Sequence, residues 1–358
     1  MYRRAYALLV GNAVLMGGLA LVAAWQLDRG LTDPEGSFLG PSYIRLPLLL
    51  FGALLLDLLP RTLWYSRLNP AAMPQLVRDR LRTHWDRERI TLVALGIVCF
   101  YIVYVCYRNL KSFLPFVRPD PDAAPGEVVA LAFDRELHLV DRALFFGHEP
   151  AAVVQGMLGE TFSAHILSYV YLWFLPLVPL ALTAWLVWSR NITFGYWFAT
   201  SQCIAWTLGT LSYYALPTLG PGIAYPQFYT EADTPATALM DSLVDGRQQV
   251  LFGGIDGAVQ SIAGFASLHT AITLLVALLV QYTLRSRVLK IAFWVNFVIT
   301  VIATIYFGWH YVADDVAGAG IALIAFYLGG LASGQKFERK GLASHPTTTT
   351  SAVPVEVD

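Results

Sequence analysis

Two histidines in this sequence have neighbours that suit them to chemistry at phosphorus. Asp314 follows His310 by four residues, and one helical turn would bring the pair onto one face. The carboxylate could then hold one ring nitrogen and leave the other free to attack. His269 lies two residues after Ser267 at the start of an apolar run, where the free N–H groups of a helix favour an anion.

Two cations complete this set of residues. Lys111 and Arg118 are separated by six residues and follow another apolar run. Two histidines, one of them oriented by a carboxylate, together with a lysine, an arginine and a hydroxyl fit phosphoryl transfer without a metal or cofactor. One histidine would attack phosphorus, the cations would hold its oxygens, and the other histidine would protonate the departing oxygen.

The elements that must position these residues lie in a membrane. Of the 358 residues, 56% are hydrophobic and 14% are charged, which is too apolar for a soluble domain. The fold class is therefore all-α, a polytopic transmembrane helical bundle of about eight spans with a six-span catalytic core. Stretches near the length that hydrocarbon requires lie at 5–25, 43–60, 89–107, 163–188, 194–216, 266–284, 288–308 and 311–333.

The distribution of charge predicts the orientation. Sixteen of the 24 lysines and arginines fall on the side of the N-terminus, and cytoplasmic loops retain positive charge. Both termini are therefore predicted to be cytoplasmic, and the histidine and cation motifs all reach the extracytoplasmic face, although long stretches of sequence separate them. This predicts an active site in a bacterial plasma membrane, or in a Golgi-like lumen if the chain is eukaryotic. No basic patch exists for nucleic acid.

Three units are predicted along the chain. They are two spans with a basic cytoplasmic loop (1–88), the catalytic core (89–334) and a disordered cytoplasmic tail without apolar periodicity (335–358). Apolar residues at helical spacing from Phe133 to Phe145, with charges between them, predict a helix in the membrane interface.

Simpler roles exist for several of these residues. Lys111 and Arg118 could be anchors that reach toward lipid phosphates, and Ser267 could only cap its helix. Asp315 lies beside Asp314 but points to a different helix face, so it is interpreted as a solvated or supporting group outside the site.

Other ionisable residues receive structural interpretations. His138, His148 and His165 lack matching motifs, and a loop or packing role is assigned to them. Asp57 is explained by an ion pair with Arg61, one helical turn later.

In this order, Lys-x6-Arg-Pro, Ser-x-His and His-x3-Asp resemble the type 2 phosphatidic acid phosphatase superfamily over roughly residues 107–320. The resemblance implies that His310 becomes a phosphohistidine, that Asp314 orients it, and that His269 acts as acid and then as base. It also implies three phosphate ligands, which are Lys111, Arg118 and Ser267.

Two departures from the pattern indicate a branch of this superfamily. The middle motif reads Ala-Ser-Leu-His instead of Pro-Ser-Gly-His, and Ala303 and Thr304 stand where the family carries Ser-Arg, so one phosphate-binding cation is absent. These features, the Asp-x-x-Leu-Phe-Phe-Gly stretch at 141–147 and the Leu-Pro-Thr-Leu-Gly-Pro loop look like the inositol phosphorylceramide synthase (inositolphosphotransferase) branch.

The expected function is that of an integral membrane lipid phosphotransferase that moves a phosphorylated headgroup to a hydroxyl acceptor through a phosphohistidine. The motifs do not specify the lipid or the acceptor. A phosphatase acting on a lipid phosphate or polyprenyl (pyro)phosphate, with water as acceptor, is the alternative. A lipid transporter or binding protein without turnover is a third possibility, for which the absent arginine is the only hint.

Overall fold

The computed structural model describes residues 3–33, 42–122, 131–229, 232–252, 262, 264–337 and 347–348. Regular structure in these residues is helical apart from two antiparallel strands of two residues each, β1 (Gln335–Lys336) and β2 (Thr347–Thr348). The prediction of an all-α fold is confirmed. Most of the predicted tail, 335–358, lies outside the described residues.

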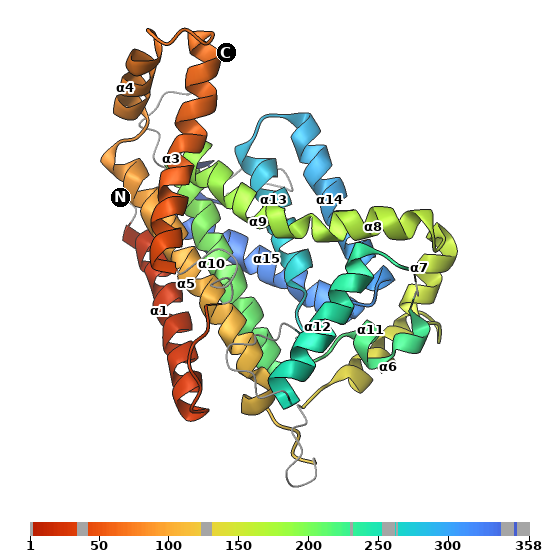
Figure 1. Ribbon diagram of the computed structural model, residues 1–358. Helices are drawn as coiled ribbons and strands as arrows, with labels where there is room; N and C mark the ends of the chain where they lie inside the picture. Colours follow the sequence, from red (N-terminus) through yellow and green to blue (C-terminus); the bar gives the residue numbers. More distant parts are fainter. Residues whose placement is uncertain are drawn as a thin grey trace.

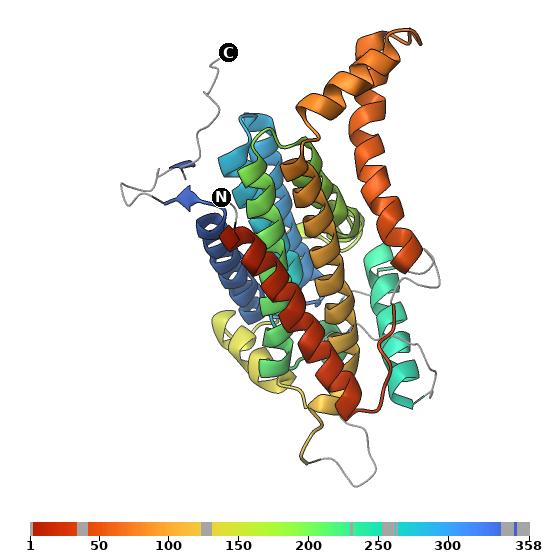
Figure 2. The same ribbon diagram turned by 90° about the vertical axis from the view of Figure 1, so that its left-hand side faces the viewer.

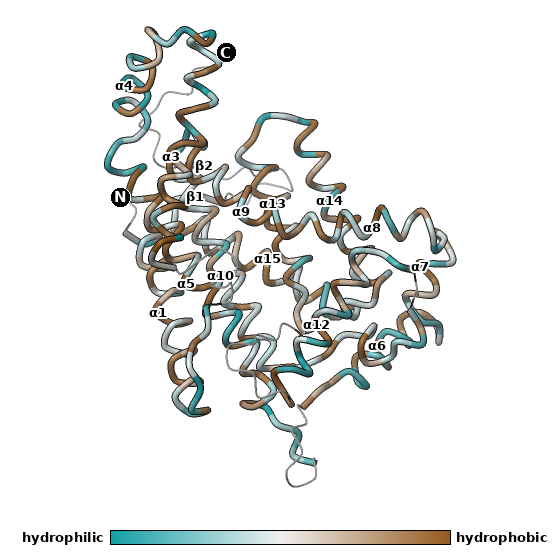
Figure 3. Tube along the Cα trace, in the orientation of Figure 1, coloured by the Kyte–Doolittle hydropathy of each residue, from teal (hydrophilic) through white to brown (hydrophobic). Residues whose placement is uncertain are grey.

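Six segments of the described chain are long and apolar enough to cross a membrane, which confirms a polytopic membrane bundle. Hydrophobic residues run along them in Figure 3. The two other predicted spans correspond to α10 (Ile192–Ala215) and α13 (Leu268–Thr283). The six segments are α1 (Arg3–Gln26), α3 (Ser42–Ser66), α5 (Arg87–Val117), α8 (Phe162–Leu172) with α9 (Phe174–Thr183) and the π turn η1 (Ala184–Trp188), α14 (Arg287–Tyr306) and α15 (Val312–Ala332).

Helix α10 forms the centre of the bundle. It packs against α1, α5, α13 and α15 (Figures 1 and 2), and large side chains such as Trp197 and Tyr196 are fully buried. Small residues allow the close approach of α15, because a Cβ on Gly329 would lie 2.2 Å from Ser201 Oγ. This tight packing gives α15 a rigid support.

The first two spans pack differently. Helix α1 buries Leu9 and Met16 against the bundle, whereas α3 stands at its edge (Figure 2). The predicted ion pair of Asp57 with Arg61 is present at 3.9 Å. A second and closer partner was not predicted: Arg80 of α4 (Met73–Thr83) makes two hydrogen bonds of 2.8 Å to the Asp57 carboxylate. The Arg80 guanidinium binds both carboxylate oxygens because α4 folds back beside α3 and presents the guanidinium side-on.

The segments between the spans form a cap at the end of the bundle where α5 ends (Figure 1). The helix predicted from Phe133 to Phe145 is present as α6 (Asp134–Leu144), and its position in the membrane interface stays a prediction. Its buried face carries two carboxylates, Asp134 and Asp141, whereas Leu139 and Leu144 are exposed. The other elements of the cap are α7 (Pro150–Leu158), α11 (Pro221–Ala224), the 3-10 turn η2 (Pro226–Phe228) and α12 (Pro235–Phe252).

Candidate functional site

The structure brings His310 and Asp314 together at the junction of α14 and α15. His310 Nδ1 lies 3.3 Å from Asp314 Oδ2, which also accepts the backbone N–H of Tyr311 at 3.0 Å. Tyr311 is the N-cap residue of α15, so the start of this helix fixes both groups. Because Nδ1 faces the carboxylate, Nε2 is the ring nitrogen available for chemistry.

His269 lies on the first turn of α13, near His310. The two imidazole centroids are 6.4 Å apart. The His269 ring is stacked on Tyr171 of α8 at 4.2 Å and contacts Phe174 of α9 at 4.0 Å. Trp309 stacks on Tyr171 at 5.0 Å. Aromatic rings therefore restrain the orientation of His269.

The two histidine motifs are joined directly through the backbone. The N–H of Ser267 donates to the carbonyl oxygen of Asp314 at 3.0 Å. At Gly318 of α15, a Cβ would lie 2.3 Å from the carbonyl oxygen of Ser267, so only glycine permits this contact. The spacing between the histidines is thus set by the packing of α13 against α15.

Ser267 caps α13, as one of the two interpretations from the sequence predicted. Its hydroxyl oxygen accepts the Thr270 N–H at 3.3 Å. The Thr270 hydroxyl donates to Asp315 at 2.5 Å, and the Thr304 hydroxyl donates to the other Asp315 oxygen at 2.9 Å. Asp315 is therefore not solvated. It is a buried supporting group that ties α13, α14 and α15 together, with Thr304 in the position where the family pattern carries arginine.

Lys111 is part of a helix instead of lying beyond a span. Helix α5 continues to Val117, past the predicted end at residue 107, and Lys111 is buried within it. Its ammonium lies 3.2 Å from Tyr107 Oη and 4.9 Å from the ring centre of Tyr213. It also lies within electrostatic range of His269. This burial is inconsistent with an anchor that reaches toward lipid phosphates.

Arg118 is the C-cap residue of α5 and is half-buried. It stands seven residues beyond Lys111, which is about 10 Å along the helix axis. The structure therefore places it at the end of α5, beyond Lys111, and its predicted role as a phosphate ligand stays a prediction.

Asp134 is a residue of the site that the sequence interpretation did not single out. Its carboxylate accepts the N–H groups of Leu219 at 2.9 Å and Gly220 at 3.0 Å, and the hydroxyl of Tyr311 at 2.9 Å. Burial raises the pKa of Asp134, and these donors oppose that rise. Asp134 thereby holds the residue next to His310 against the loop that follows α10.

Asp141 makes a second contact from α6 to the same segment. Both of its oxygens lie 3.2 Å from the N–H of Val312, the first residue of α15. Burial raises the pKa of Asp141 to about 7. The sequence contains a signal for this face, since Asp134, Leu137 and Asp141 recur at helical spacing.

His138 of α6 has packing contacts. His138 stacks on Tyr225 at 4.2 Å, and its Nε2 lies 3.5 Å from Glu149. These contacts match the predicted packing role of His138 and separate it from the pair formed by His269 and His310.

Taken together, the site can carry out attack on phosphorus by one imidazole and proton transfer by another. It also contains an unused donor, because the buried Trp309 Nε1 has no hydrogen-bond partner in the described part of the chain. An N–H group without a partner beside two histidines suits an oxyanion.

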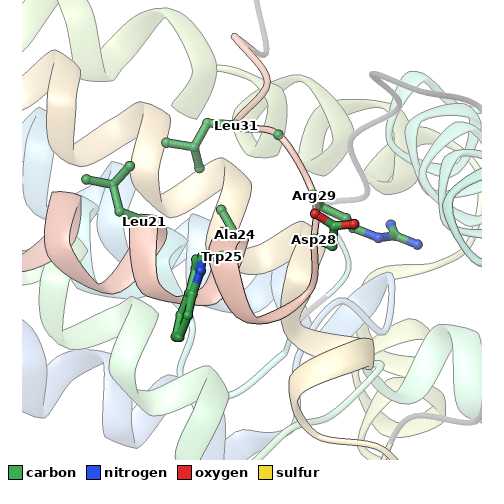
Figure 4. A pocket seen from close by; sticks show the side chains of 7 residues that line it. Leu21, Ala24, Trp25, Asp28, Arg29 and Leu31 are labelled. Carbon is green, nitrogen blue, oxygen red and sulfur yellow. The ribbon is translucent and has the colours of Figure 1, made fainter.

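The described part of the chain also has a hollow that lies away from this chemistry. A wide groove of about 540 Å³ is found at the end of α1, and Trp25, Asp28 and Arg29 are among the residues that line it (Figure 4). None of the predicted site residues lines it. The convergence of functional groups, and not the size of a hollow, therefore defines the candidate site.

Comparison with known proteins gives one match. A sequence model of the PAP2 superfamily matches residues 135–328, a range that contains His269, His310 and Asp314 and starts beyond Lys111 and Arg118. No curated protein and no solved structure matches the chain significantly.

Proposed function

The chain belongs to the PAP2 superfamily, whose members are generally phosphatases and phosphotransferases, and from this premise we propose that it is a lipid phosphotransferase. It moves a phosphorylated headgroup from a lipid donor to a hydroxyl acceptor. The observation that carries the proposal is the pair His310–Asp314 with His269 at 6.4 Å between ring centroids.

In the first half of the reaction, His310 Nε2 attacks the donor phosphorus. A P–N bond forms while the P–O bond to the departing lipid alcohol breaks, and His269 in its protonated form donates a proton to that oxygen. Asp314 stabilises the positive charge that develops on the His310 ring.

In the second half, the acceptor hydroxyl attacks the phosphohistidine. His269, now neutral, takes the proton of the hydroxyl, the new P–O bond forms, and the P–N bond breaks. Both histidines then return to their starting states. If the donor is a lipid phosphate and water replaces the acceptor, the same steps release inorganic phosphate, which is the phosphatase alternative.

Cations and donors around the two histidines neutralise the phosphate oxygens in this proposal. Lys111 is one such cation, since it acts electrostatically on His269, and Arg118 follows on the same helix. Ser267 and the Trp309 indole N–H supply uncharged donors. Groups of this kind lower the barrier because they face the charge that develops at phosphorus.

The six apolar segments make the chain an integral membrane protein. From the excess of lysine and arginine on the N-terminal side, we infer that the termini face the cytoplasm and the histidines face the opposite side, in a bacterial plasma membrane. The donor is then a lipid that exposes its headgroup on the extracytoplasmic leaflet.

The proposal is tested with the purified full chain and His310→Ala, in detergent with EDTA. Phosphate release and headgroup exchange are followed across phospholipids and polyprenyl phosphates. Headgroup exchange that His310→Ala abolishes supports the phosphotransferase, whereas phosphate release without exchange makes the protein a phosphatase. Turnover that persists in His310→Ala refutes the nucleophile assignment, and a wild type that binds lipid without any turnover indicates a binding protein or transporter.

A further inference from the structure

A half-buried arginine outside the proposed catalytic set lies close to it. Arg247 of α12 lines a small cavity with Leu114 and Pro115 at the end of α5 and with Thr218 in the loop after α10. The ends of α12 and α5 lie near each other in Figure 1. Leu114 is one helical turn beyond Lys111, which corresponds to about 5 Å along the axis. The cavity therefore adjoins the proposed phosphate site.

The polar groups of this cavity have no partners in the described part of the chain. Thr218 is 3% exposed, and its hydroxyl makes no hydrogen bond. The Arg247 guanidinium has neither an ion pair nor a hydrogen bond there. A buried hydroxyl is normally paired, so the unpaired Thr218 hydroxyl together with the unpaired guanidinium of the half-buried Arg247 at a single cavity points to a ligand.

One carboxylate attracts Arg247 but does not take the role of partner. Asp134 attracts Arg247 electrostatically, but its oxygens already accept from Leu219, Gly220 and Tyr311. Burial lowers the pKa of the Arg247 guanidinium, which still remains charged. Its charge is consequently available for an anion from outside the protein.

We propose that Arg247 and Thr218 bind a second phosphate group of the substrate, adjacent to the phosphate on which His310 acts. A guanidinium matches the planar arrangement of phosphate oxygens and binds two of them at once. The cavity measures about 10 Å³, which is room for about one water-sized group, so a single phosphate oxygen fits between the two side chains. This inference rests on the proposed function.

Two substrates carry such a group. A donor lipid with a diphosphate places its second phosphate beside the reacting one, and an acceptor with a phosphate brings it with the attacking hydroxyl. Both use the same recognition chemistry, and kinetics with each substrate distinguish them.

The experiment compares wild type, Arg247→Gln and Arg247→Lys with Arg135→Gln, an exposed arginine of α6, as the matched control. Binding of inorganic phosphate and pyrophosphate to the full chain in detergent is measured by calorimetry. Pyrophosphate should bind more tightly than phosphate to the wild type and to Arg135→Gln. Arg247→Gln should lose about tenfold to hundredfold in pyrophosphate affinity and little in phosphate affinity, as expected for hydrogen bonds to a charged group. Arg247→Lys should retain part of the preference.

The kinetic arms use a lipid monophosphate, a lipid diphosphate and a phosphorylated acceptor. An increased KM of Arg247→Gln for the diphosphate alone assigns the second phosphate to the donor, and an increased KM for the phosphorylated acceptor alone assigns it to the acceptor. Equal affinities of the wild type for phosphate and pyrophosphate, or equal losses of both in Arg247→Gln, overturn the inference. Because calorimetry needs no turnover, an inactive wild type would refute the proposed function and leave this test intact.

Discussion

Tyr311→Phe isolates the contact between α6 and the segment that carries His310. The Tyr311 hydroxyl donates to Asp134 at 2.9 Å, and its side chain is fully buried. Phenylalanine keeps the ring and removes only the hydroxyl. Because Tyr311 follows His310 directly and its N–H donates to Asp314, loss of this bond should loosen the nucleophile as well as the fold.

The size of the effect follows from the partners that remain. A hydrogen bond to a charged group contributes about 1.5–3 kcal/mol, and no water replaces the hydroxyl at a fully buried position. The Asp134 carboxylate keeps the N–H groups of Leu219 and Gly220, so the lower half of this range is expected for stability. If the whole free energy of the hydrogen bond between Tyr311 and Asp134 also serves to hold His310 in its reactive orientation, kcat falls by about 10- to 100-fold in Tyr311→Phe.

The assay combines the thermal midpoint of unfolding in detergent with kcat on a lipid phosphate, for Tyr311→Phe, Asp134→Asn and the double variant. A coupling energy of about 1 kcal/mol or more between the two positions is expected, since the residues touch. Strictly additive losses, or a Tyr311→Phe protein with the stability and kcat of the wild type, would show that this contact does not position the nucleophile.

Three further changes have defined outcomes. Burial raises the pKa of Asp141 to about 7, above its ordinary value near 4. The native state therefore binds the proton more tightly than the unfolded state, and the free energy of unfolding falls as the pH rises from about 4 to about 7. Asp141→Asn should remove this slope from thermal midpoints measured across that window, and a slope equal to that of the wild type would contradict the assignment. Trp309→Phe keeps an aromatic ring for stacking on Tyr171 but removes the unpartnered indole N–H, so kcat should fall roughly tenfold with a smaller effect on the thermal midpoint. An unchanged kcat would exclude a role for this donor. Arg80→Leu should lower the free energy of unfolding by about 3–5 kcal/mol because it leaves the Asp57 carboxylate buried without its main partner. Arg61→Leu, the matched control, should lower it by about 0.5 kcal/mol. Equal decreases in the two variants would mean that the two arginines share Asp57.

The membrane fold could be predicted from the sequence because its main determinant is local. A span needs a continuous apolar stretch of a certain length, and that property is visible in composition alone. The pairing of His310 with Asp314 is also local, since the two are four residues apart at the start of one helix. The same holds for Ser267, whose capping role depends only on the residues that follow it.

The end of α5 shows where local reasoning fails. The predicted span stopped at residue 107, but the helix continues to Val117. The additional turns carry a charge at Lys111, and the aromatic side chains of Tyr107 and Tyr213 beside it help to make its burial possible. Tyr213 belongs to another helix, so no pattern of residues within α5 predicts that Lys111 is buried beside it.

The sequence by itself determined that this chain is a bundle of membrane helices and that it carries three motifs typical of phosphoryl transfer. The tertiary structure decided which ionisable groups support them. Asp134, Asp141 and Asp315 are buried because donors from distant segments meet them: Tyr311, Val312 and two threonines. A buried carboxylate is stable only where such donors converge, and this convergence depends on the packing of helices far apart in the chain, which no local pattern of residues encodes.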